Sequence, residues 1–428
     1  MSTPHRQANS FIRQLLHSKS LAELSEQLRP SSEPLPRKFR GSFRLTEQRV
    51  QHHWEQLDSI ADRQDTPDIQ DTLLDPQTLE YLQAYQHNIE NFIGTVKLPV
   101  GIAGPLRMNG LFAQGDYLIP LATTEAALVA SYARGCQLIS EAEGCQALLL
   151  NEAVNRTPGF AFATLQEVGV FLAWAVSQQD NFQREAEATT RYGKLIDTRF
   201  TVEGNHVYLD FQFTTGDAAG QNMVTIATDA ICQYILAHTP ITPHHWFIEA
   251  NLSGDKKASA QSFSGVRGKK VTAEVTISAT LIEQRLHTTA EQMANYWRMS
   301  ALGGTMSGTI GVQGHYANGL AALYIACGQD AACVAESAVG VTRFELTSDG
   351  GLYAAVTLPN LIVGTVGGGT GLPSQQACLQ ILGLAGPGHA RAFAELCAGL
   401  ALAGELSIIG ALSAGEFVQA HARLARGR

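Results

Sequence analysis

Residues 207–223 read VYLDFQFTTGDAAGQNM, and this stretch decides the fold class. From Val207 to Phe213, apolar and polar residues alternate, a spacing typical of a half-buried β-strand. Two glycines follow, and the residues after Gly220 predict a helix. A strand, a glycine turn and a helix start together offer backbone N–H groups to a pyrophosphate. Because the spacing is not the Gly-x-Gly-x-x-Gly of a Rossmann domain, we expect a different α+β arrangement.

The segments on either side of this stretch differ in composition. Residues 158–248 combine a helical pattern around 173–190 with the strand pattern above, which predicts a small α+β subdomain. Residues 1–88 show helical spacing of apolar residues and predict a helical N-terminal arm. Residues 270–277 predict another strand, and the apolar sequence from about 391 to 425 predicts a helix. A chain of 428 residues organised in this way predicts two or three domains.

The composition argues against several classes of protein. Charged residues make up 16% of the chain, against about 25% in an average globular protein, so we expect much buried surface, including surface between subunits. A formal net charge of −9 without a long basic run argues against a nucleic acid partner and favours a small anionic ligand. The N-terminus has no apolar signal core, and no uninterrupted apolar stretch reaches the ~20 residues of a membrane span. We therefore expect no membrane anchor.

The seven cysteines are scattered and include no Cys-x-x-Cys pair. This spacing predicts neither a structural zinc site nor a disulfide framework, and we expect no bound metal. The neighbours of the cysteines are small and apolar, as at Cys327 and Cys378, which favours buried reduced thiols over catalytic ones. Reduced thiols are in turn consistent with a cytoplasmic protein.

Three charged positions stand out as candidates for chemistry. Asp330 lies in the apolar stretch 323–332, where an unpaired carboxylate would be costly, so it needs a partner. Lys256, between Asp255 and Lys257, is a candidate for that partner. Glu125 follows two threonines and precedes apolar residues, so we expect it in the first turn of a helix. Each motif also has a simpler interpretation, since first-turn acids often only complement the helix dipole and charged turns are often only solvated.

Two further motifs lie towards the C-terminus. Residues 364–371 read GTVGGGTG and lack the Lys-Ser/Thr ending of a P-loop, so they do not predict an ATPase. They predict either a tight turn or a place where a ligand lies against bare backbone. His421 lies near the end of the predicted terminal helix, where a histidine is usually inert.

Eight segments, taken in order, resemble the 3-hydroxy-3-methylglutaryl-CoA (HMG-CoA) reductase family, in the soluble form of the class shared by eukaryotes and archaea. They are Glu90–Gly94, Pro99–Leu106, Ala122–Glu125, Arg134–Cys136, Thr215–Met223, Asp255–Lys257, Ile325–Ala332 and Gly364–Thr370. The resemblance covers about residues 90–426.

The resemblance implies a fold and a reaction. The fold is α+β, with a large substrate-binding domain built around a long central helix and an inserted ferredoxin-like NADPH-binding subdomain. The parts are a helical arm (1–88), the large domain (89–157 and 249–400), the insertion (158–248) and a C-terminal helix or flap (401–428). The reaction is the NADPH-dependent four-electron reduction of an acyl-CoA thioester to the alcohol with release of CoA, with HMG-CoA to mevalonate as the leading candidate.

Two alternatives to that reaction stay open. One is reduction of a different acyl-CoA or of a thioester bound to a carrier protein. The other is a non-catalytic scaffold, which is disfavoured because the four residues matching the family's catalytic groups are all present.

Those four residues have distinct implied roles. Glu125 matches the glutamate that donates a proton to the carbonyl oxygen, with a pKa raised by burial. Lys256 matches the lysine that stabilises the oxyanion, and Asp330 matches the aspartate that holds the glutamate and lysine in a network. His421 matches the histidine that protonates the departing CoA thiolate, on a terminal flap that closes over the thioester.

The resemblance also implies binding residues and an assembly. For NADPH they are Arg191, Asp217, Ala218, Gly220, Asn222, Met223, Gly367, Gly368, Gly369 and Arg426. For the CoA thioester they are Glu90, Asn91, Ser131, Arg134, Arg156, Glu249, Asp255, Lys257, Arg298, His315 and Asn318. The family implies a homodimer, or a dimer of dimers, with active sites shared between subunits.

The chain departs from the family at two positions in the expected acyl pocket. Glu249 stands where the family has a serine, and a carboxylate there would repel the substrate carboxylate unless it is turned away, protonated or paired with Arg156, Lys257 or Arg298. Gln313 replaces the usual asparagine two residues before the histidine. The reaction type is therefore better specified by the sequence than the acyl group is.

Overall fold

The computed structural model describes residues 3–30, 44–60 and 69–415. These residues fall into two compact units. Unit 1 comprises the described residues up to 79 together with 89–95, and unit 2 comprises 80–88 and 96–415. The expected boundary at residue 88 therefore differs from the observed division, because residues 89–95 pack back on the helices of unit 1.

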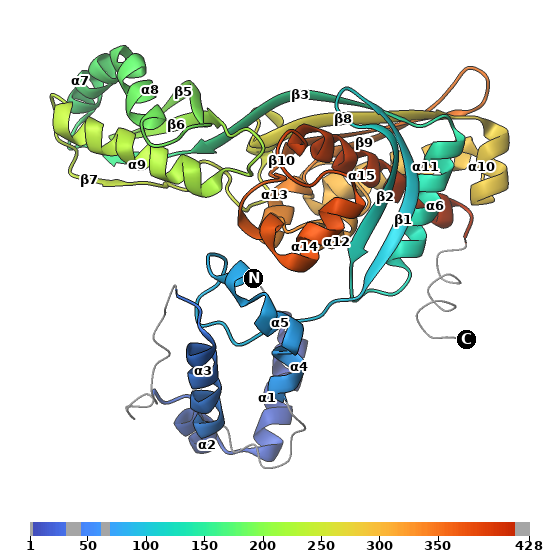
Figure 1. Ribbon diagram of the computed structural model, residues 1–428, viewed down its shortest axis with the longest axis horizontal. Coiled ribbons are helices and arrows are strands. Elements are labelled where there is room, and N and C mark those ends of the chain that lie inside the picture. The colour runs from blue at the N-terminus through green and yellow to red at the C-terminus, as the bar shows by residue number, and fades with distance from the viewer. Residues whose placement is uncertain (1–2, 31–43, 61–68, 416–428) are drawn as a thin grey trace. The chain divides into compact units, whose positions relative to one another are not determined.

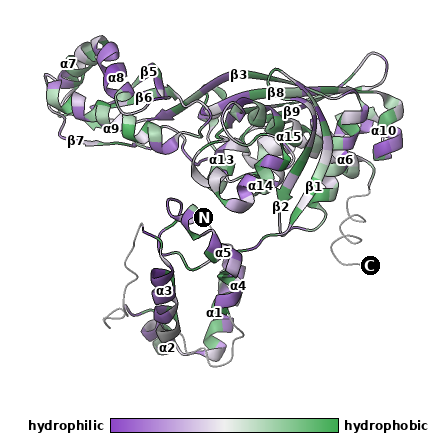
Figure 2. Ribbon diagram, viewed as in Figure 1, coloured by the Kyte–Doolittle hydropathy of each residue, from purple (hydrophilic) through white to green (hydrophobic). Residues whose placement is uncertain are grey.

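Unit 1 is helical, as the apolar spacing predicts. Its helices are α1 (His5–Ser18), α2 (Leu21–Gln27), α3 (Glu47–Ile60), α4 (Ile69–Leu73) and α5 (Pro76–Glu80), the last of which ends at the unit boundary. Hydrophilic residues predominate along α3 (Figure 2). Its buried face nevertheless contacts the segment 89–95, because Trp54 Nε1 donates a hydrogen bond to Ile93 O at 2.9 Å. Glu90 and Asn91 therefore belong to unit 1.

Unit 2 is built on two sheet regions that share the strand β3 (Cys145–Arg156) (Figure 1). Most of β3 pairs with β8 (Gly268–Ile277), and its last three residues pair with β6 (His206–Thr214) instead. The larger region also contains β1 (Val100–Gly110), β2 (Gln114–Ala122), β9 (Val341–Leu346) and β10 (Leu352–Leu361). Its strand order is β2-β1-β3-β8-β10-β9, with only the β1–β3 pair parallel.

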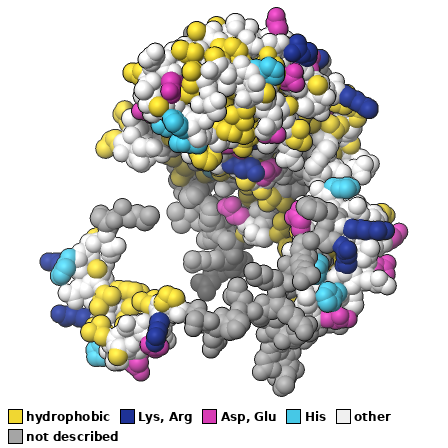
Figure 3. Space-filling view, turned by 90° about the vertical axis from the view of Figure 1, so that its left-hand side faces the viewer, with side chains coloured by type: hydrophobic (Ala, Val, Ile, Leu, Met, Phe, Trp, Pro, Cys, Tyr) yellow, Lys and Arg dark blue, Asp and Glu magenta, His cyan; other side chains and the backbone are white. Residues whose placement is uncertain are grey.

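The smaller region has the topology of a ferredoxin-like fold. In chain order its elements are β4 (Gly159–Ala161), α7 (Leu165–Ala175), α8 (Gln179–Glu187), β5 (Lys194–Glu203), β6, α9 (Gln221–His238) and β7 (His245–Phe247). The strand order β7-β4-β6-β5 is antiparallel throughout, as expected for two interleaved βαβ halves. The strand predicted over 207–213 lies in β6, and the helix predicted after Gly220 is α9, so both predictions are confirmed. On the face drawn in Figure 3, Lys and Arg side chains are interspersed with Asp and Glu.

The long central helix is α15 (Ala390–Ser413), which is buried without interruption from Ala392 to Ser407. It packs on α6 (Leu128–Glu141), α12 (Tyr316–Ala326), β8 and β10. Within the described ranges, α15 is the one helix long and apolar enough to match a membrane span, but 83% of its most apolar stretch is buried inside the structure. Packing in the core therefore accounts for its apolar composition. The boundary expected at residue 401 falls inside this helix, which has no break there.

The remaining elements place the loops that carry the motifs. They are η1 (Leu82–Tyr85), η2 (Val176–Gln178), η3 (Ala260–Phe263), α10 (Ala279–Leu286), α11 (Ala290–Ser307), η4 (Ala331–Cys333), α13 (Val334–Ser337), η5 (Gly368–Gly371) and α14 (Pro373–Ile381). All seven cysteines are buried and free, which confirms the prediction of buried reduced thiols.

Candidate active site

The loops at residues 217–220, 328–329 and 364–369 are far apart in the sequence but pack against one another at their glycines. A Cβ atom added to Gly369 would lie 2.7 Å from Gly328 O, and one added to Gly364 would lie 2.7 Å from the carbonyl carbon of Ala218. Backbone therefore packs directly on backbone, and a side chain at either glycine would push the loops apart. The Gln329 amide joins the same loops, because it donates to Gly364 O and accepts from Gly364 N–H, each at 2.9 Å.

Asp217 ties the glycine turn before α9 to the other elements. Its backbone oxygen accepts from Thr365 N–H at 2.8 Å, and its carboxylate accepts from Gly388 N–H at 2.8 Å and Ala390 N–H at 3.1 Å. Ala218 forms a parallel bridge with Val366. Asp217 therefore positions the loop, since its carboxylate is already bonded at the start of α15.

The beginning of α9 is open to a ligand. Gly220, the residue before the helix, has φ 79° and gives no side-chain cap, so no side chain in the described part of the chain pairs with the first N–H groups of α9. Asn222 and Met223 lie in the first turn, and Thr190 donates a hydrogen bond to the Met223 sulfur at 3.0 Å. This contact brings the exposed loop that carries Arg191 against the start of α9.

Gly367 and Gly368 are exposed, with φ of 75° and 55°. A Cβ atom on either glycine would meet nothing within 4 Å. This loop therefore presents bare backbone next to the turn that precedes α9. The structure thus brings together all the expected NADPH residues except Arg426, which lies outside the described residues.

Lys256 and Asp330 form an ion pair at the edge of the same loops. Lys256 Nζ lies 2.8 Å from Asp330 Oδ2. The pair is half-buried, with side-chain exposures of 42% and 40%, so Asp330 is less enclosed than its apolar sequence predicts. The hydrogen bond with Asp330 raises the pKa of Lys256. Burial alone would raise the pKa of Asp330, but hydrogen bonds from Lys256 and from Ala332 N–H outweigh it and lower that pKa.

A buried cluster of charges lies beside this pair. Arg156 Nη1 donates to Glu249 Oε2 and to Asp255 Oδ2, both at 3.0 Å. Arg267 Nη2 donates to Asp255 Oδ1 at 2.8 Å, and its Nη1 bonds both oxygens of Glu336 at 2.7 and 2.6 Å. Of the three possibilities for Glu249, the structure shows pairing with Arg156.

Arg267 and Glu336 are not among the residues predicted from the sequence. Glu336 is an acid within apolar sequence, the same signal that singled out Asp330, and applying that signal to every acid would have found it. Arg267 has no comparable signal, because basic residues precede many strands. Burial raises the pKa of Glu336, while Arg267 acts in the opposite direction.

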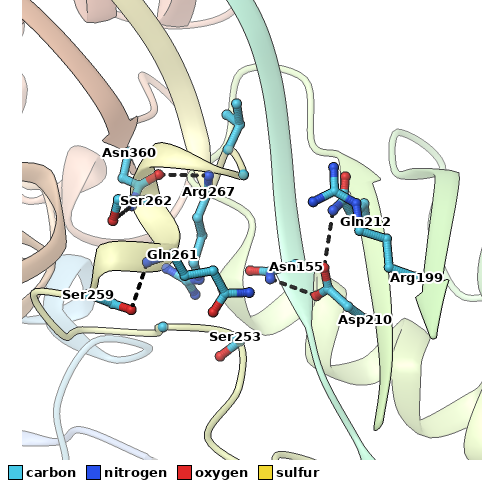
Figure 4. A pocket seen from close by; sticks show the side chains of 13 residues that line it. Asn155, Arg199, Asp210, Gln212, Ser253, Ser259, Gln261, Ser262, Arg267 and Asn360 are labelled. Carbon is cyan, nitrogen blue, oxygen red and sulfur yellow. Dashed lines mark hydrogen bonds between the residues drawn. The ribbon is translucent and has the colours of Figure 1, made fainter. Parts of the chain in front are cut away.

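A small polar cavity adjoins this cluster and shares Arg267 with it (Figure 4). It is lined by residues of β3, β5, β6 and β10 and by the loops before β8, and Asp210 in its wall accepts from Asn155 at 2.7 Å and Gln212 at 3.1 Å. Its volume of about 20 Å³ is close to that of one water molecule. The cavity is therefore too small for an acyl group.

Glu125 is separate from the lysine pair, and two expectations about it are wrong. It is exposed rather than buried, and it precedes α6, which begins at Leu128 after Ala127 takes φ 70°. The Glu125 N–H bonds Thr123 Oγ1 at 3.0 Å, and this local turn replaces the first helical turn. Among the described residues, Glu125 makes neither a hydrogen bond nor an ion pair with Lys256 or Asp330.

His315 lies close to Glu405 at the start of α12. Its ring stacks on Tyr132 with centroids 5.6 Å apart, and its Nδ1 lies 3.9 Å from Glu405 Oε1. Desolvation lowers the pKa of His315 to about 4, so it is neutral at pH 7. Asn318 follows in the first turn of α12, which Gln313 supports by accepting from Tyr316 N–H at 3.0 Å.

The other expected substrate residues are dispersed. Ser131 and Arg134 both bond Ser407 of α15, so Arg134 ties α6 to the core helix. Lys257 is exposed and donates to Asp255 O at 2.8 Å, and Arg298 is exposed on α11. Glu90 and Asn91 belong to unit 1, and His421 lies outside the described residues.

The structure matches that of the class II HMG-CoA reductase of Streptococcus pneumoniae, described as bound to NADPH, with a TM-score of 0.64 over 86% of this chain and 97% of that one. At 19% identity this likeness establishes the fold alone, which is α+β.

The sequence comparisons then establish the family. The family model for hydroxymethylglutaryl-coenzyme A reductase matches residues 52–426. The HMG-CoA reductase of Pyrococcus horikoshii is 42% identical over 79% of this chain and 84% of its own length. That of Methanothermobacter thermautotrophicus is 42% identical over 82% and 88%. The chain therefore belongs to the hydroxymethylglutaryl-coenzyme A reductase family.

Proposed function

We propose that this chain reduces HMG-CoA to mevalonate and free CoA, consuming two NADPH and two protons per thioester. The observation that carries this proposal is the 2.8 Å pair of Lys256 and Asp330 at the edge of the glycine loops. A fixed cation next to a nucleotide-binding surface suits the reduction of a carbonyl, where negative charge develops on oxygen.

The residues of unit 2 fit NADPH. The uncapped start of α9 offers N–H groups to a pyrophosphate, and exposed Gly367 and Gly368 let a ligand approach the backbone. We assign the pairing with a 2′-phosphate to Arg191, which is exposed on the loop that contacts Met223. When bound, NADPH supplies the hydride.

Lys256 is the group assigned to the developing oxyanion. Its raised pKa keeps the ammonium charged at neutral pH, and Asp330 fixes the direction in which it points. We assign proton donation to the carbonyl oxygen to Glu125 and protonation of the CoA thiolate to His421, by their match to the family. Asp330 acts through Lys256, so it is a positioning residue.

The exposure of Glu125 supports a shared active site. Glu125 and the Lys256–Asp330 pair do not touch within one chain, yet the reaction needs both at one carbonyl. We assign the missing contact to a second copy of this chain in a homodimer. Met299, Leu302 and Met306 are 76%, 68% and 88% exposed at helical spacing on α11, and this apolar face suits a partner subunit. The cytoplasmic location rests on the seven free thiols.

A second candidate substrate is favoured by the pairing of Glu249 with Arg156. Two carboxylates already neutralise Arg156, so a third from the substrate would enter an acidic cluster. A thioester whose acyl group lacks a free carboxylate avoids that cost. The thioester can be carried on CoA or on a carrier protein.

The test is oxidation of NADPH by purified protein with HMG-CoA, followed by absorbance, with mevalonate and free thiol measured as products. Two NADPH consumed per thiol released supports the proposal. Lys256→Ala should reduce turnover by about 10²- to 10³-fold, the usual cost of losing one oxyanion donor. Turnover of a neutral acyl-CoA but not of HMG-CoA would support the second candidate.

A further inference from the structure

The backbone of Lys256 is held in a conformation that its residue type disfavours. Its φ is 56°, in the left-handed region, where a side chain crowds the following carbonyl. Such a conformation persists only where the surroundings impose it. The ammonium of Lys256 pairs with Asp330. The contacts that impose the backbone conformation of Lys256 therefore also determine where its ammonium lies.

The segment 330–336 bonds both the side chain and the backbone of Lys256. Asp330, just before η4, accepts from the side-chain Nζ at 2.8 Å. Glu336, in α13 of the same segment, accepts from the backbone N–H of Lys256 at 3.1 Å. Glu336 is completely buried, so this acceptor has little freedom to move.

Arg267 bonds both Glu336 and Asp255, the residue before Lys256, and so fixes their positions relative to each other. Its Nη1 bonds both oxygens of Glu336, and its Nη2 bonds Asp255 Oδ1 at 2.8 Å. Arg267 is itself 3% exposed, and its backbone N–H is held by Asn360 Oδ1 at 3.0 Å (Figure 4). The planar guanidinium fits this double task, whereas a lysine would make only point contacts.

We infer that Arg267 and Glu336 are positioning residues of the reaction, which hold Lys256 in its left-handed backbone conformation and so aim its ammonium at the reacting carbonyl. The kinetic part of this inference rests on the proposed function. The structural part, the dependence of the Lys256 conformation on Glu336, does not.

The test uses the full-length variants Glu336→Ala and Glu336→Gln. Crystal structures of both give φ of residue 256 and the distance from its Nζ to Asp330. In Glu336→Ala we expect residue 256 to leave the left-handed region and the ion pair to lengthen. In Glu336→Gln the amide oxygen still accepts from the Lys256 N–H, so we expect the conformation to be retained.

Kinetics should follow the structures. For Glu336→Ala we expect kcat to fall by about 10- to 100-fold, as for small misplacements of reacting groups, while KM and the affinity for NADPH change little. The deuterium isotope effect with NADPH labelled at the transferred position should rise, because hydride transfer becomes slower than other steps. Glu336→Gln should recover much of the loss.

Glu395→Ala is the matched control. Glu395 is also completely buried and also accepts backbone N–H bonds, from Phe112 and Ala113 at 2.8 Å, but it contacts none of the site residues above. It should lower thermal stability without changing the isotope effect. If Glu336→Ala fails to fold, Arg267→Lys is used in its place, with the same expectations.

Two results would overturn the inference: residue 256 keeping its conformation without Glu336, or Glu395→Ala changing kcat and the isotope effect equally. Failure of the wild-type protein to reduce HMG-CoA would overturn the proposed function instead, and the crystal structures would still decide this inference.

Discussion

Glu249 Oε2 lies 3.0 Å from Arg156 Nη1, on the same guanidinium nitrogen that bonds Asp255. The Arg156 side chain is only 9% exposed, so its charge is balanced inside the protein by two acids. A second bond fixes Glu249, whose Oε1 accepts from Asn251 N–H at 2.7 Å. The glutamate is therefore part of an ordered cluster and is not turned away from it.

Replacing Glu249 should change which acyl groups are accepted. In Glu249→Ser, Arg156 loses one of its two acids, and we expect kcat/KM for HMG-CoA to rise about tenfold relative to that for a neutral acyl-CoA, a difference of roughly 1.4 kcal/mol. The measurement is the ratio of the two kcat/KM values, with Glu249→Gln as the control that removes the charge but keeps the size. An unchanged ratio in both variants would exclude Glu249 as a determinant of specificity.

The pH dependence of turnover should report the Lys256–Asp330 pair. The raised pKa of Lys256 means that activity persists to higher pH than an ordinary lysine allows. In Asp330→Asn the hydrogen-bonded carboxylate is lost, so we expect the alkaline limb of the kcat profile to move to lower pH. A limb that stays in place would show that another group controls it.

The same pair should contribute to stability within a defined pH window. Because the folded pKa of Asp330 is lowered, its contribution is complete above the ordinary value of 3.8 and is lost as pH falls through the lowered pKa. Because that of Lys256 is raised, its contribution is complete below the ordinary value of 10.5 and is lost as pH rises through the raised pKa. The difference in unfolding free energy between the wild type and Asp330→Asn should therefore be flat between these values and shrink outside them.

Mixing two inactive variants should test the shared site. If Glu125 and Lys256 act from different subunits, co-expressed Glu125→Gln and Lys256→Ala form mixed dimers with one intact site, restoring about a quarter of wild-type activity. Each variant alone remains inactive. No recovery, with mixed dimers verified by differently tagged chains, would place both residues in the same subunit's site.

Gly328→Ala should separate the glycine loops. Gly328 has φ 69°, and its Cβ atom would collide with the backbone of Gly369, so we expect roughly 1–3 kcal/mol of destabilisation and weaker NADPH binding. The measurements are thermal unfolding and titration of NADPH by fluorescence. Gly350→Ala is the control, since Gly350 has φ 84° with nothing within 4 Å of its Cβ position. Equal NADPH affinity in both variants would contradict the role of this contact.

Local patterns account for the parts of the fold that were predicted correctly. The alternation over 207–213 marks β6, and the glycine before α9 marks the start of that helix. The Lys256–Asp330 pair was predictable from chemistry, because an acid in apolar sequence needs a cation. The two wrong expectations about Glu125 share one cause: its exposure and the start of α6 depend on a turn closed by Thr123, which competes with the helix.

The sequence by itself determined the order of elements, the resemblance to a family and the residue types available for catalysis, because periodicity and motif spacing are properties of neighbouring residues. Apart from the Lys256–Asp330 pair, only the tertiary structure decided which charges meet. From the sequence, Glu249 could be turned away, protonated or paired with Arg156, Lys257 or Arg298. It pairs with Arg156, which also bonds Asp255, because the end of β3 and the loop after β7 converge there. The bonds of Glu336 to Arg267 and to the Lys256 N–H likewise exist only once α13 lies against the loops that carry those residues, since burial makes each charge depend on partners that are distant in the chain.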